Sequence, residues 1–316
     1  MSQRIGVIDM GTNTFHLLIT DIVDDKPHIL VNEKSAVGLG KGGINRGVIT
    51  VEAMDRALNT LKKYRAVLDT YAVTHVIATG TSAVRTATNK QQLIDRIKNE
   101  VNIEVEVIDG AREAELIFRG VQQAVFMEDK ISLAMDIGGG SVEFIIGNQN
   151  EIIWKQSFEI GGQRLIERFH MHDPMREDDR IIMHEYFDHV LVPLKEAIQK
   201  WNPVLFIGCS GTFDTLAEMN IQYHREKILL EKQTSYLLSR TDFKRMRDQM
   251  VTSTKAERLK IAGMIELRAD MVVVAVCLIE HVMRLVRTHA ITVSTYSLKE
   301  GVLYTMLDGE KVGGNY

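Results

Sequence analysis

The chain has 316 residues, of which 45% are hydrophobic and 25% charged, and its net charge is −4 at pH 7. This is the composition of a soluble globular protein, without the basic excess that would favour nucleic acid. The longest apolar stretch, residues 271–279, is far shorter than the ~18–20 residues that span a bilayer. Since residues 4–9 already read as a strand rather than a signal peptide, we expect a cytoplasmic protein without nucleic-acid or membrane partners. The length favours two domains.

The first half alternates strand and helix patterns in the order β-β-β-α-β-α-β-α. Its long helix has Thr50 as a candidate N-cap, followed by apolar residues at helical spacing from Ala53 to Leu68. The predicted elements are strands at 4–9, 14–23 and 27–36, a helix at 50–72, a strand at 74–79, a helix at 89–101, a strand at 103–108 and a helix at 111–126.

The second half repeats this plan after a soft boundary near 125–130. The predicted elements are strands at 131–136, 142–147 and 150–158, helices between 161 and 200, a strand at 204–208, further helices, a strand at 290–294 and a helix from about 297. Each half therefore predicts an α/β domain with a mixed sheet flanked by helices, over residues 1–126 and 127–316. Cys209 and Cys277 lie amid apolar residues, so we expect buried, reduced thiols.

The most informative motif occurs once in each half: an apolar strand ends in Asp, and a turn rich in Gly, Ser and Thr follows. The residues are Asp9 with Gly11, Thr12, Asn13 and Thr14 in the first half, and Asp136 with Gly138, Gly139, Gly140 and Ser141 in the second. Glycines let backbone amides converge on an anion, hydroxyls add donors, and the Asp can hold a cation against the same phosphate. Two copies suggest a duplicated domain that closes on a phosphate chain.

Two further small-residue turns follow predicted strands. Ser210, Gly211 and Thr212 precede a segment with helical spacing, so their amides would lie at a helix N-terminus, which favours anions. The turn at 79–83 leads to Arg85, which could supply fixed positive charge to a phosphate. Any one turn could be an ordinary connection. Four together predict one cleft, because ligands of α/β sheets bind at the carboxyl ends of strands.

Carboxylates near these turns are candidates for acid–base or metal chemistry. Glu113 and Glu115 lie in the first turn of a predicted helix, where one could polarise a water, although such charges are commonly solvated. Glu143 follows Ser141 by two residues and so points to the same face of its strand, toward a cleft or toward the core. The cluster 170–173 contains two His and an Asp without companion ligands, so we expect a polar surface turn rather than a metal site.

Together these motifs closely resemble the exopolyphosphatase/guanosine pentaphosphate phosphohydrolase (Ppx/GppA) family, a branch of the actin-like, sugar kinase and heat-shock ATPase superfamily. The matches lie, in order, within residues 8–14, 78–85, 113–121, 136–143, 161–162, 208–212, 268–270, 294 and 300–301. The resemblance implies two ribonuclease-H-like domains with mixed five-stranded sheets and an active site between them. It also implies hydrolysis of a phosphoanhydride that releases terminal phosphate with Mg²⁺.

The resemblance implies roles for single residues. Glu113 matches the water-activating glutamate, and Arg85 the arginine that faces the phosphates. Asp136 and Glu143 match acids that position metal and water, and Asp9 the acid of the first phosphate loop.

This chain departs from the family pattern in two places. Members commonly read Glu-Glu-Ala-Arg where it has Arg112-Glu113-Ala114-Glu115, and Gly-Leu-Arg-Glu-Gly where it has Ser297-Leu298-Lys299-Glu300-Gly301. The first departure leaves the acid in place but changes its neighbour. The second replaces a bidentate arginine by Lys299.

We hypothesise in-line attack on the terminal phosphorus by a water that Glu113 deprotonates. Three functions stay open: hydrolysis of inorganic polyphosphate, which leads; hydrolysis of guanosine pentaphosphate, with a guanine pocket expected near 210–213; and an actin-type sensor that closes on its ligand. A sugar kinase is disfavoured, since no acceptor-sugar pocket is indicated. The sequence does not fix the oligomeric state, and a homodimer is one expectation.

Overall fold

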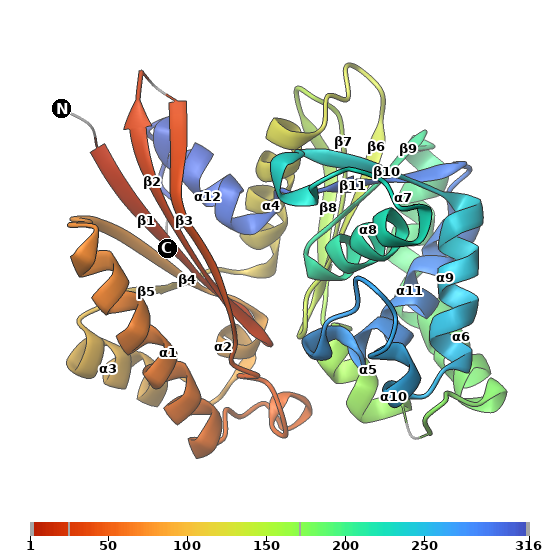
Figure 1. Ribbon diagram of the computed structural model, residues 1–316, viewed down its shortest axis with the longest axis horizontal. Coiled ribbons are helices and arrows are strands. Elements are labelled where there is room, and N and C mark those ends of the chain that lie inside the picture. The colour runs from red at the N-terminus through yellow and green to blue at the C-terminus, as the bar shows by residue number, and fades with distance from the viewer. Residues whose placement is uncertain (1–2, 25, 171, 314–316) are drawn as a thin grey trace.

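The computed structural model describes residues 3–24, 26–170 and 172–313. Two α/β halves lie side by side, each built on a twisted sheet with helices packed against it (Figure 1). The sheet of the first half has five strands in the order β3-β2-β1-β4-β5, and β1 is antiparallel to β2 but parallel to β4. The strands are β1 (Gln3–Met10), β2 (Thr14–Val23), β3 (Lys26–Ala36), β4 (His75–Gly80) and β5 (Val105–Val107).

The helices of the first half cover this sheet and shape one end of it. They are α1 (Val51–Thr70), α2 (Ser82–Thr86) and α3 (Lys90–Val101), with a 3-10 turn η1 (Ile44–Arg46). The predicted N-cap of α1 is confirmed, because the Thr50 hydroxyl accepts a hydrogen bond from the amide of Ala53 at 3.2 Å. The short α2 occupies what the sequence pattern indicates as a polar turn, and it carries Arg85 in its last turn.

The sheet of the second half is also mixed but has six strands rather than the expected five, in the order β10-β11-β9-β6-β7-β8. The additional strand β10 pairs antiparallel with β11 at the edge. It has five residues, and its short apolar stretch at 236–238 leaves Leu237 67% exposed. The strands are β6 (Ser132–Ile137), β7 (Val142–Gly147), β8 (Ile152–Phe158), β9 (Leu205–Cys209), β10 (Ser235–Ser239) and β11 (Ala290–Ser294).

The second half contains most of the helices and the largest core cluster. Its helical segments are α5 (Gly162–Phe169), α6 (Glu177–Val190), α7 (Val192–Trp201), α8 (Gly211–His224), η2 (Leu230–Lys232), α9 (Arg240–Thr252), α10 (Lys255–Arg258), η3 (Glu266–Arg268) and α11 (Met271–Leu285). Cys209 and Cys277 are both buried and unpaired, as expected. Within the described part of the chain, no helix is both long and apolar enough to cross a membrane.

Two helices, α4 (Gly110–Ala124) and α12 (Leu298–Leu307), fill the junction between the sheets. α12 follows the second sheet in sequence but packs on α4 and β1 (Figure 1). The helices approach closely because Gly301 faces the Leu116 carbonyl and Gly120 faces that of Ser297, where a Cβ on either glycine would overlap backbone. A third core cluster forms here from both halves. The boundary at residue 126 stays a prediction.

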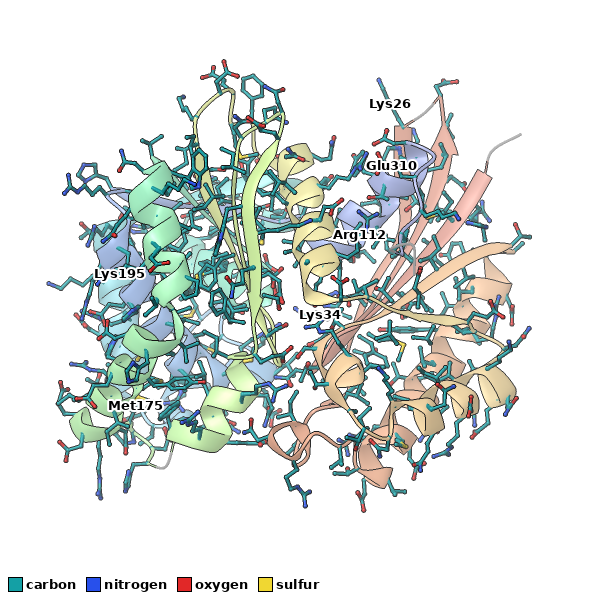
Figure 2. All side chains as sticks on the ribbon, turned by 180° about the vertical axis from the view of Figure 1, so that it is seen from behind. Lys26, Lys34, Arg112, Met175, Lys195 and Glu310 are labelled. Carbon is teal, nitrogen blue, oxygen red and sulfur yellow. The ribbon has the colours of Figure 1, made fainter. Side chains whose placement is uncertain are left out.

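The segment after α12 is tied to α4 by two arginines. Arg112 donates from Nε to the carbonyl of Val312 at 2.7 Å, and Arg119 forms an ion pair with Glu310 at 2.7 Å. Figure 2 labels Arg112 and Glu310 at this junction. Arg112 also pairs with Glu115 at 2.5 Å, and Glu115 with Lys155 at 2.6 Å. The exchanged charges of the 112–115 segment therefore stabilise the junction.

Candidate active site between the two sheets

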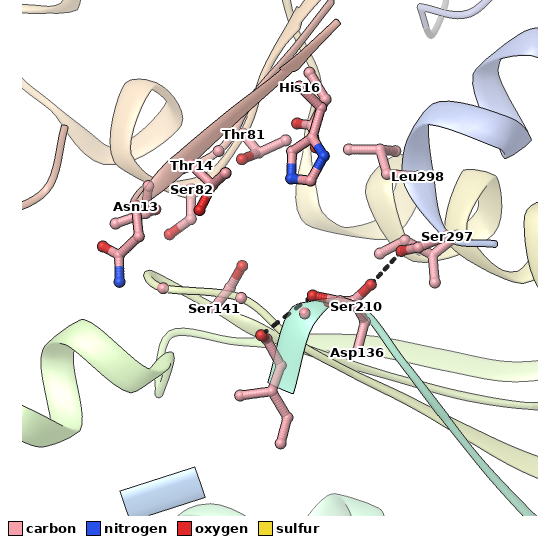
Figure 3. A pocket seen from close by; sticks show the side chains of 18 of the residues that line it. Asn13, Thr14, His16, Thr81, Ser82, Asp136, Ser141, Ser210, Ser297 and Leu298 are labelled. Carbon is pink, nitrogen blue, oxygen red and sulfur yellow. Dashed lines mark hydrogen bonds between the residues drawn. The ribbon is translucent and has the colours of Figure 1, made fainter. Parts of the chain in front are cut away.

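Two equivalent hairpin turns, one from each half, form the walls of a pocket between the sheets (Figure 3). In the first, the amide of Gly11 donates to the carbonyl of Thr14 at 3.1 Å, and in the second the amide of Gly138 donates to that of Ser141 at 3.0 Å. The residues predicted in both turns, 11–14 and 138–141, line this pocket. The two turns are therefore closed by the same hydrogen bond, as the predicted duplication implies.

The second turn is braced by the first turn of α5, which directs its backbone. Three carbonyls accept from α5 and the residue before it: Gly138 from Gly162 at 2.9 Å, Gly139 from Gln163 at 2.8 Å, and Gly140 from Gly161 at 3.1 Å. Because the carbonyl and the amide of one trans peptide point in opposite directions, the next amides in the turn point away from α5. This leaves backbone donors available to an anion.

The two turns also pack directly against one another. A Cβ at Gly139 would collide with the Asn13 side chain, and one at Gly140 with the hydroxyls of Thr12 and Ser82. Glycine is needed here for close approach, since neither residue has a left-handed φ. The structure thus joins the two halves across the phosphate-type loops themselves.

Strand pairing brings the acids of the two hairpins together. Asp136 lies opposite Glu143 in the β6–β7 pair, and Asp9 opposite His16 at the same place in the β1–β2 pair. Asp9 and Asp136 line the pocket, while Glu143 is 1% exposed and hydrogen-bonded to Ser157 at 2.6 Å. Asp136 accepts from the Ser297 hydroxyl, as Figure 3 shows.

Burial leaves these carboxyls poorly solvated and raises their pKa values. The pKa of Asp9 rises to about 8, through desolvation and the nearby charges of Glu113 and Asp136. That of Asp136 rises to about 6, although hydrogen bonds from Ser297 and Cys209 oppose the effect of burial. The pKa of Glu143 lies well above its usual value for the same reason, desolvation. Asp9 Oδ1 is buried and has no hydrogen-bond partner among the described residues.

Glu113 lies at the pocket wall in the first turn of α4. Its helix begins at Asp109, whose carboxylate caps the amide of Arg112 at 2.7 Å. Glu113 is 6% exposed and accepts from Arg85 Nη1 at 2.6 Å. Burial raises the pKa of Glu113 to about 7, and the Arg85 guanidinium holds it from rising further. The pKa of this carboxyl therefore lies close to neutral pH.

The other predicted residues divide into two groups. Ser210 and Gly211 line the pocket, and Ser210 has a positive φ of 74°. Three predicted residues do not line the pocket: Thr212, Arg85 and Glu143. The buried hydroxyl of Thr212 has no hydrogen-bond partner among the described residues. Arg85 nevertheless contacts the pocket through Glu113.

The structure adds residues that sequence reasoning did not select as site residues. His16, Asp214, Arg268, Ser297 and Lys299 line the pocket, and the ammonium of Lys34 lies close to Gly211 near Arg268. Burial, with Lys299, Lys34 and Arg268 nearby, keeps the pKa of His16 far below its usual value, so this imidazole is neutral. A spacing signal for His16 existed, because it follows Thr14 by two positions as Glu143 follows Ser141.

The chemistry of the donor set fits a hard cation. Asp9, Asp136 and Glu143 offer oxygen ligands, and the burial of the unpartnered Asp9 oxygen would be relieved by a positive charge. Within the described residues, no three His, Cys, Asp or Glu side chains form a complete metal cage. Mg²⁺ commonly uses only one or two carboxylates and completes its shell with phosphates and water. In the 170–173 segment, His172 pairs with Asp179 at 2.8 Å instead.

Comparison with known proteins identifies the family and the fold. Residues 18–310 match the Ppx/GppA phosphatase family. A crystal structure of an exopolyphosphatase from Cytophaga hutchinsonii is 82% identical, with a TM-score of 0.97 over 99% of this chain and 100% of the other. The Ppx/GppA family member from Aquifex aeolicus is 25% identical, with a TM-score of 0.81 over 98% of this chain and 99% of the other.

The named relatives carry different enzyme names. Exopolyphosphatase 1 of Mycobacterium tuberculosis is 25% identical over 98% of this chain and 90% of its own length. A guanosine-5'-triphosphate,3'-diphosphate pyrophosphatase of Vibrio vulnificus is 26% identical over 97% of this chain but only 60% of its own length. The chain spans 36% of a bifunctional 3-dehydroquinate synthase/phosphatase of Fusobacterium nucleatum, which is 34% identical over 72% of this chain. The chain has the paired hairpins and buried acids described above, and it is similar to these relatives. Because the family match covers residues 18–310, the chain belongs to the Ppx/GppA phosphatase family.

Proposed function

We propose that this protein releases terminal orthophosphate from inorganic polyphosphate, with Glu113 as the base that activates water. One observation carries the proposal: a buried glutamate with a pKa near 7, held by Arg85 beside two loops that can present backbone amides. A base of that pKa combines ready proton acceptance with a substantial ionised fraction at neutral pH. Phosphoryl transfer needs positioning and charge neutralisation more than a nucleophilic side chain, and this pocket is rich in donors.

The role of each residue follows from its place in the pocket. The amides of loops 11–14 and 138–141 bind the phosphoryl oxygens, and Glu113 orients a water in line with the terminal phosphorus and takes its proton. Lys299, Arg268 and Lys34 supply positive charge around the end of the pocket formed by Gly211. Arg85 holds Glu113 in place and keeps it sufficiently ionised.

Magnesium fits the same site. Asp136 and Asp9 would hold the ion, with the buried Glu143 beside Asp136 ordering its surroundings. When bound, Mg²⁺ neutralises charge on the phosphoryl oxygens. The mixed signs of the pocket suit this arrangement, because unpaired buried carboxylates would otherwise repel a polyanion.

Polyphosphate is favoured over guanosine pentaphosphate by the surroundings of Gly211. The guanine pocket expected near 210–213 needs an accessible aromatic or polar surface, but Phe213 is fully buried against Phe206, and Thr212 is 1% exposed. The pocket end instead presents cations, which suit a repeating anion. Guanosine pentaphosphate hydrolysis is the second candidate, supported by the Vibrio relative's name.

The test is phosphate release, measured side by side from tripolyphosphate, long-chain polyphosphate, guanosine pentaphosphate and ATP, with and without Mg²⁺. Glu113→Gln should lower kcat by about 10²–10⁴-fold while substrate binding persists, since a general base contributes about that factor. Glu115→Gln is the matched control, because Glu115 lies on the same helix but pairs with Arg112 and Lys155. Undiminished release by Glu113→Gln would exclude this base. Ligand-induced closure without release by the wild-type protein would indicate a sensor.

A further inference from the structure

The two halves are joined differently on the two sides of the cleft. One side is apolar, because α4 and α12 pack between the sheets. Buried residues of both sheets, such as Val7 of β1 and Ala134 of β6, belong to the same hydrophobic cluster there. The other side is polar and partly exposed, where α2 and η1 of the first half meet α5 (Figure 1). Opening the apolar side would cost about 25 cal/mol per Å² exposed. Exposed polar pairs contribute only ~0–1 kcal/mol each, so the polar side is the one that costs less to separate.

Glu159 lies at the centre of this polar seam, which we define as the contacts of Glu159, Arg164 and Glu167 with the first half. Its carboxylate accepts from the Ser82 hydroxyl at 2.7 Å and from Arg85 Nη2 at 3.2 Å. Arg164 of the second half donates to the same carboxylate at 2.8 Å and to the carbonyl of Ile44 at 3.0 Å. Glu159 therefore connects two arginines that belong to different halves.

The seam is coupled to the second phosphate-type loop. Arg164 Nε donates to the carbonyl of Gly140 at 2.8 Å, and Gly161, two residues after Glu159, donates its amide to the same carbonyl at 3.1 Å. The Gly140 carbonyl therefore links loop 138–141 directly to the segment that carries Glu159. The same segment contacts α2, where Ser82 lines the pocket.

Arg85 is the point at which the seam reaches the proposed chemistry. Its guanidinium lies between two carboxylates, with Nη1 on Glu113 of the first half and Nη2 on Glu159 of the second. Glu113 and the Ile108 carbonyl, the latter at 3.3 Å, both accept from Nη1, whereas the second carboxylate binds the other end of the planar group and fixes its rotation. Side-chain exposure differs as well, at 8% for Glu113 and 41% for Glu159, so Glu159 is the partner that can separate.

We propose that Glu159 is a positioning residue: it latches the polar seam through Ser82 and Arg164, and it orients Arg85 toward Glu113 only when the two halves are closed. This inference rests on the proposed function, in which Glu113 is the base. The inference implies that substrate enters an open cleft, in which Arg85 is held only from the first half. Closure then adds the contact between Arg85 and Glu159. Glu159 acts through Arg85 and needs no contact with substrate.

The kinetic test compares Glu159→Ala and Glu159→Gln with Glu167→Ala. Glu167 crosses the same seam, accepting from the amide of Gly42 at 3.2 Å and from Asn45 at 3.1 Å, but it has no contact with Arg85. Loss of a positioning contact should lower kcat by about tenfold in both Glu159 variants. In an Arg85→Ala background, Glu159→Ala should have little further effect, because the group it positions is gone. Glu167→Ala should keep kcat within about twofold of wild type.

A second readout follows closure without turnover. Spin labels at Glu52→Cys on α1 and Asp178→Cys on α6 report the separation of the halves, since both positions are exposed and the native thiols are buried. Glu159→Ala should broaden and lengthen the distance distribution. Wild-type kcat with an unchanged distribution in Glu159→Ala, or additive losses with Arg85→Ala, would overturn the inference. If wild-type protein releases no phosphate from any substrate, the proposed function fails, and the label distances alone decide whether the latch exists.

Discussion

Replacing Arg85 with Gln should move the pH dependence of phosphate release, in addition to lowering its rate. The Arg85 guanidinium lies 2.6 Å from Glu113 and opposes the burial that raises the pKa of this carboxyl to about 7. An adjacent opposite charge lowers a carboxyl pKa by ~1–3 units. Loss of the guanidinium should therefore raise the pKa of Glu113 by that amount.

The size of the effect follows from the ionised fraction of Glu113, which acts as a base only when ionised. With a pKa of about 7, about half of the molecules are competent at pH 7. A pKa one unit higher leaves about a tenth, and three units higher about a thousandth, so the rate at pH 7 should fall between about fivefold and about 500-fold. The rate should recover about tenfold per pH unit as the pH rises toward the new pKa.

The assay is phosphate release at saturating tripolyphosphate across the pH range in which the protein stays folded. Arg96→Gln serves as the control, because Arg96 is an exposed arginine of α3 that pairs with Asp55 and Glu100. Arg85→Lys, which keeps the charge, should shift the profile less than Arg85→Gln. A rate that falls equally at every pH, with the apparent pKa unchanged, would refute the reasoning and assign Arg85 to the phosphate instead.

Three further predictions concern stability. Glu143→Gln should raise the thermal unfolding midpoint of the ligand-free protein at pH 8 but not near pH 4. Burial raises the pKa of Glu143 in the native state. Above pH ~4.3 the unfolded chain therefore releases a proton that the native state retains, so stability falls as pH rises. Equal midpoints for wild type and variant at pH 8 would contradict this. Gly301→Ala should lower the free energy of unfolding by about 3 kcal/mol, because its Cβ overlaps the Leu116 carbonyl; a wild-type urea midpoint would disprove the close helix contact. Mg²⁺ should raise the unfolding midpoint more at pH 8 than at pH 5, because pKa values of about 8 for Asp9 and about 6 for Asp136 leave few ionised ligands at pH 5. Asp136→Asn should remove that difference, and a midpoint insensitive to Mg²⁺ at both pH values would count against the metal site.

Local chemistry explains which parts of the site are readable from sequence. The turns after Asp9 and Asp136 are visible because an acid, glycines and hydroxyls follow one another within a few residues. The strands around them are equally clear, since their apolar runs are continuous. Strand β10 is less clear, because its apolar stretch of three residues, 236–238, lies between helical segments and is too short to distinguish an edge strand.

Packing brings further residues to the pocket from elements that are distant in sequence. Lys34 comes from β3, and only the packing of that strand brings it to Gly211, whereas Asp214 lies three positions after Gly211 in the first turn of α8. Arg268 comes from η3, where the match at 268–270 includes it without predicting its role in the pocket. Glu159, just after β8, is of the same kind, because only packing brings it to Arg85, which the turn at 79–83 does predict. His16 differs, because comparison of the two hairpins position by position would have found it.

The position of α12 bears on how the protein assembles during synthesis. β1 is translated before both sheets are complete, yet the helix that packs on it is translated only after the whole second sheet. Until α12 has been synthesised, the apolar surface of the amino-terminal sheet that α12 covers stays exposed. Chaperones can bind that surface, and it can also cause aggregation. Such long-range closure makes slow, cooperative folding of both halves the expected behaviour.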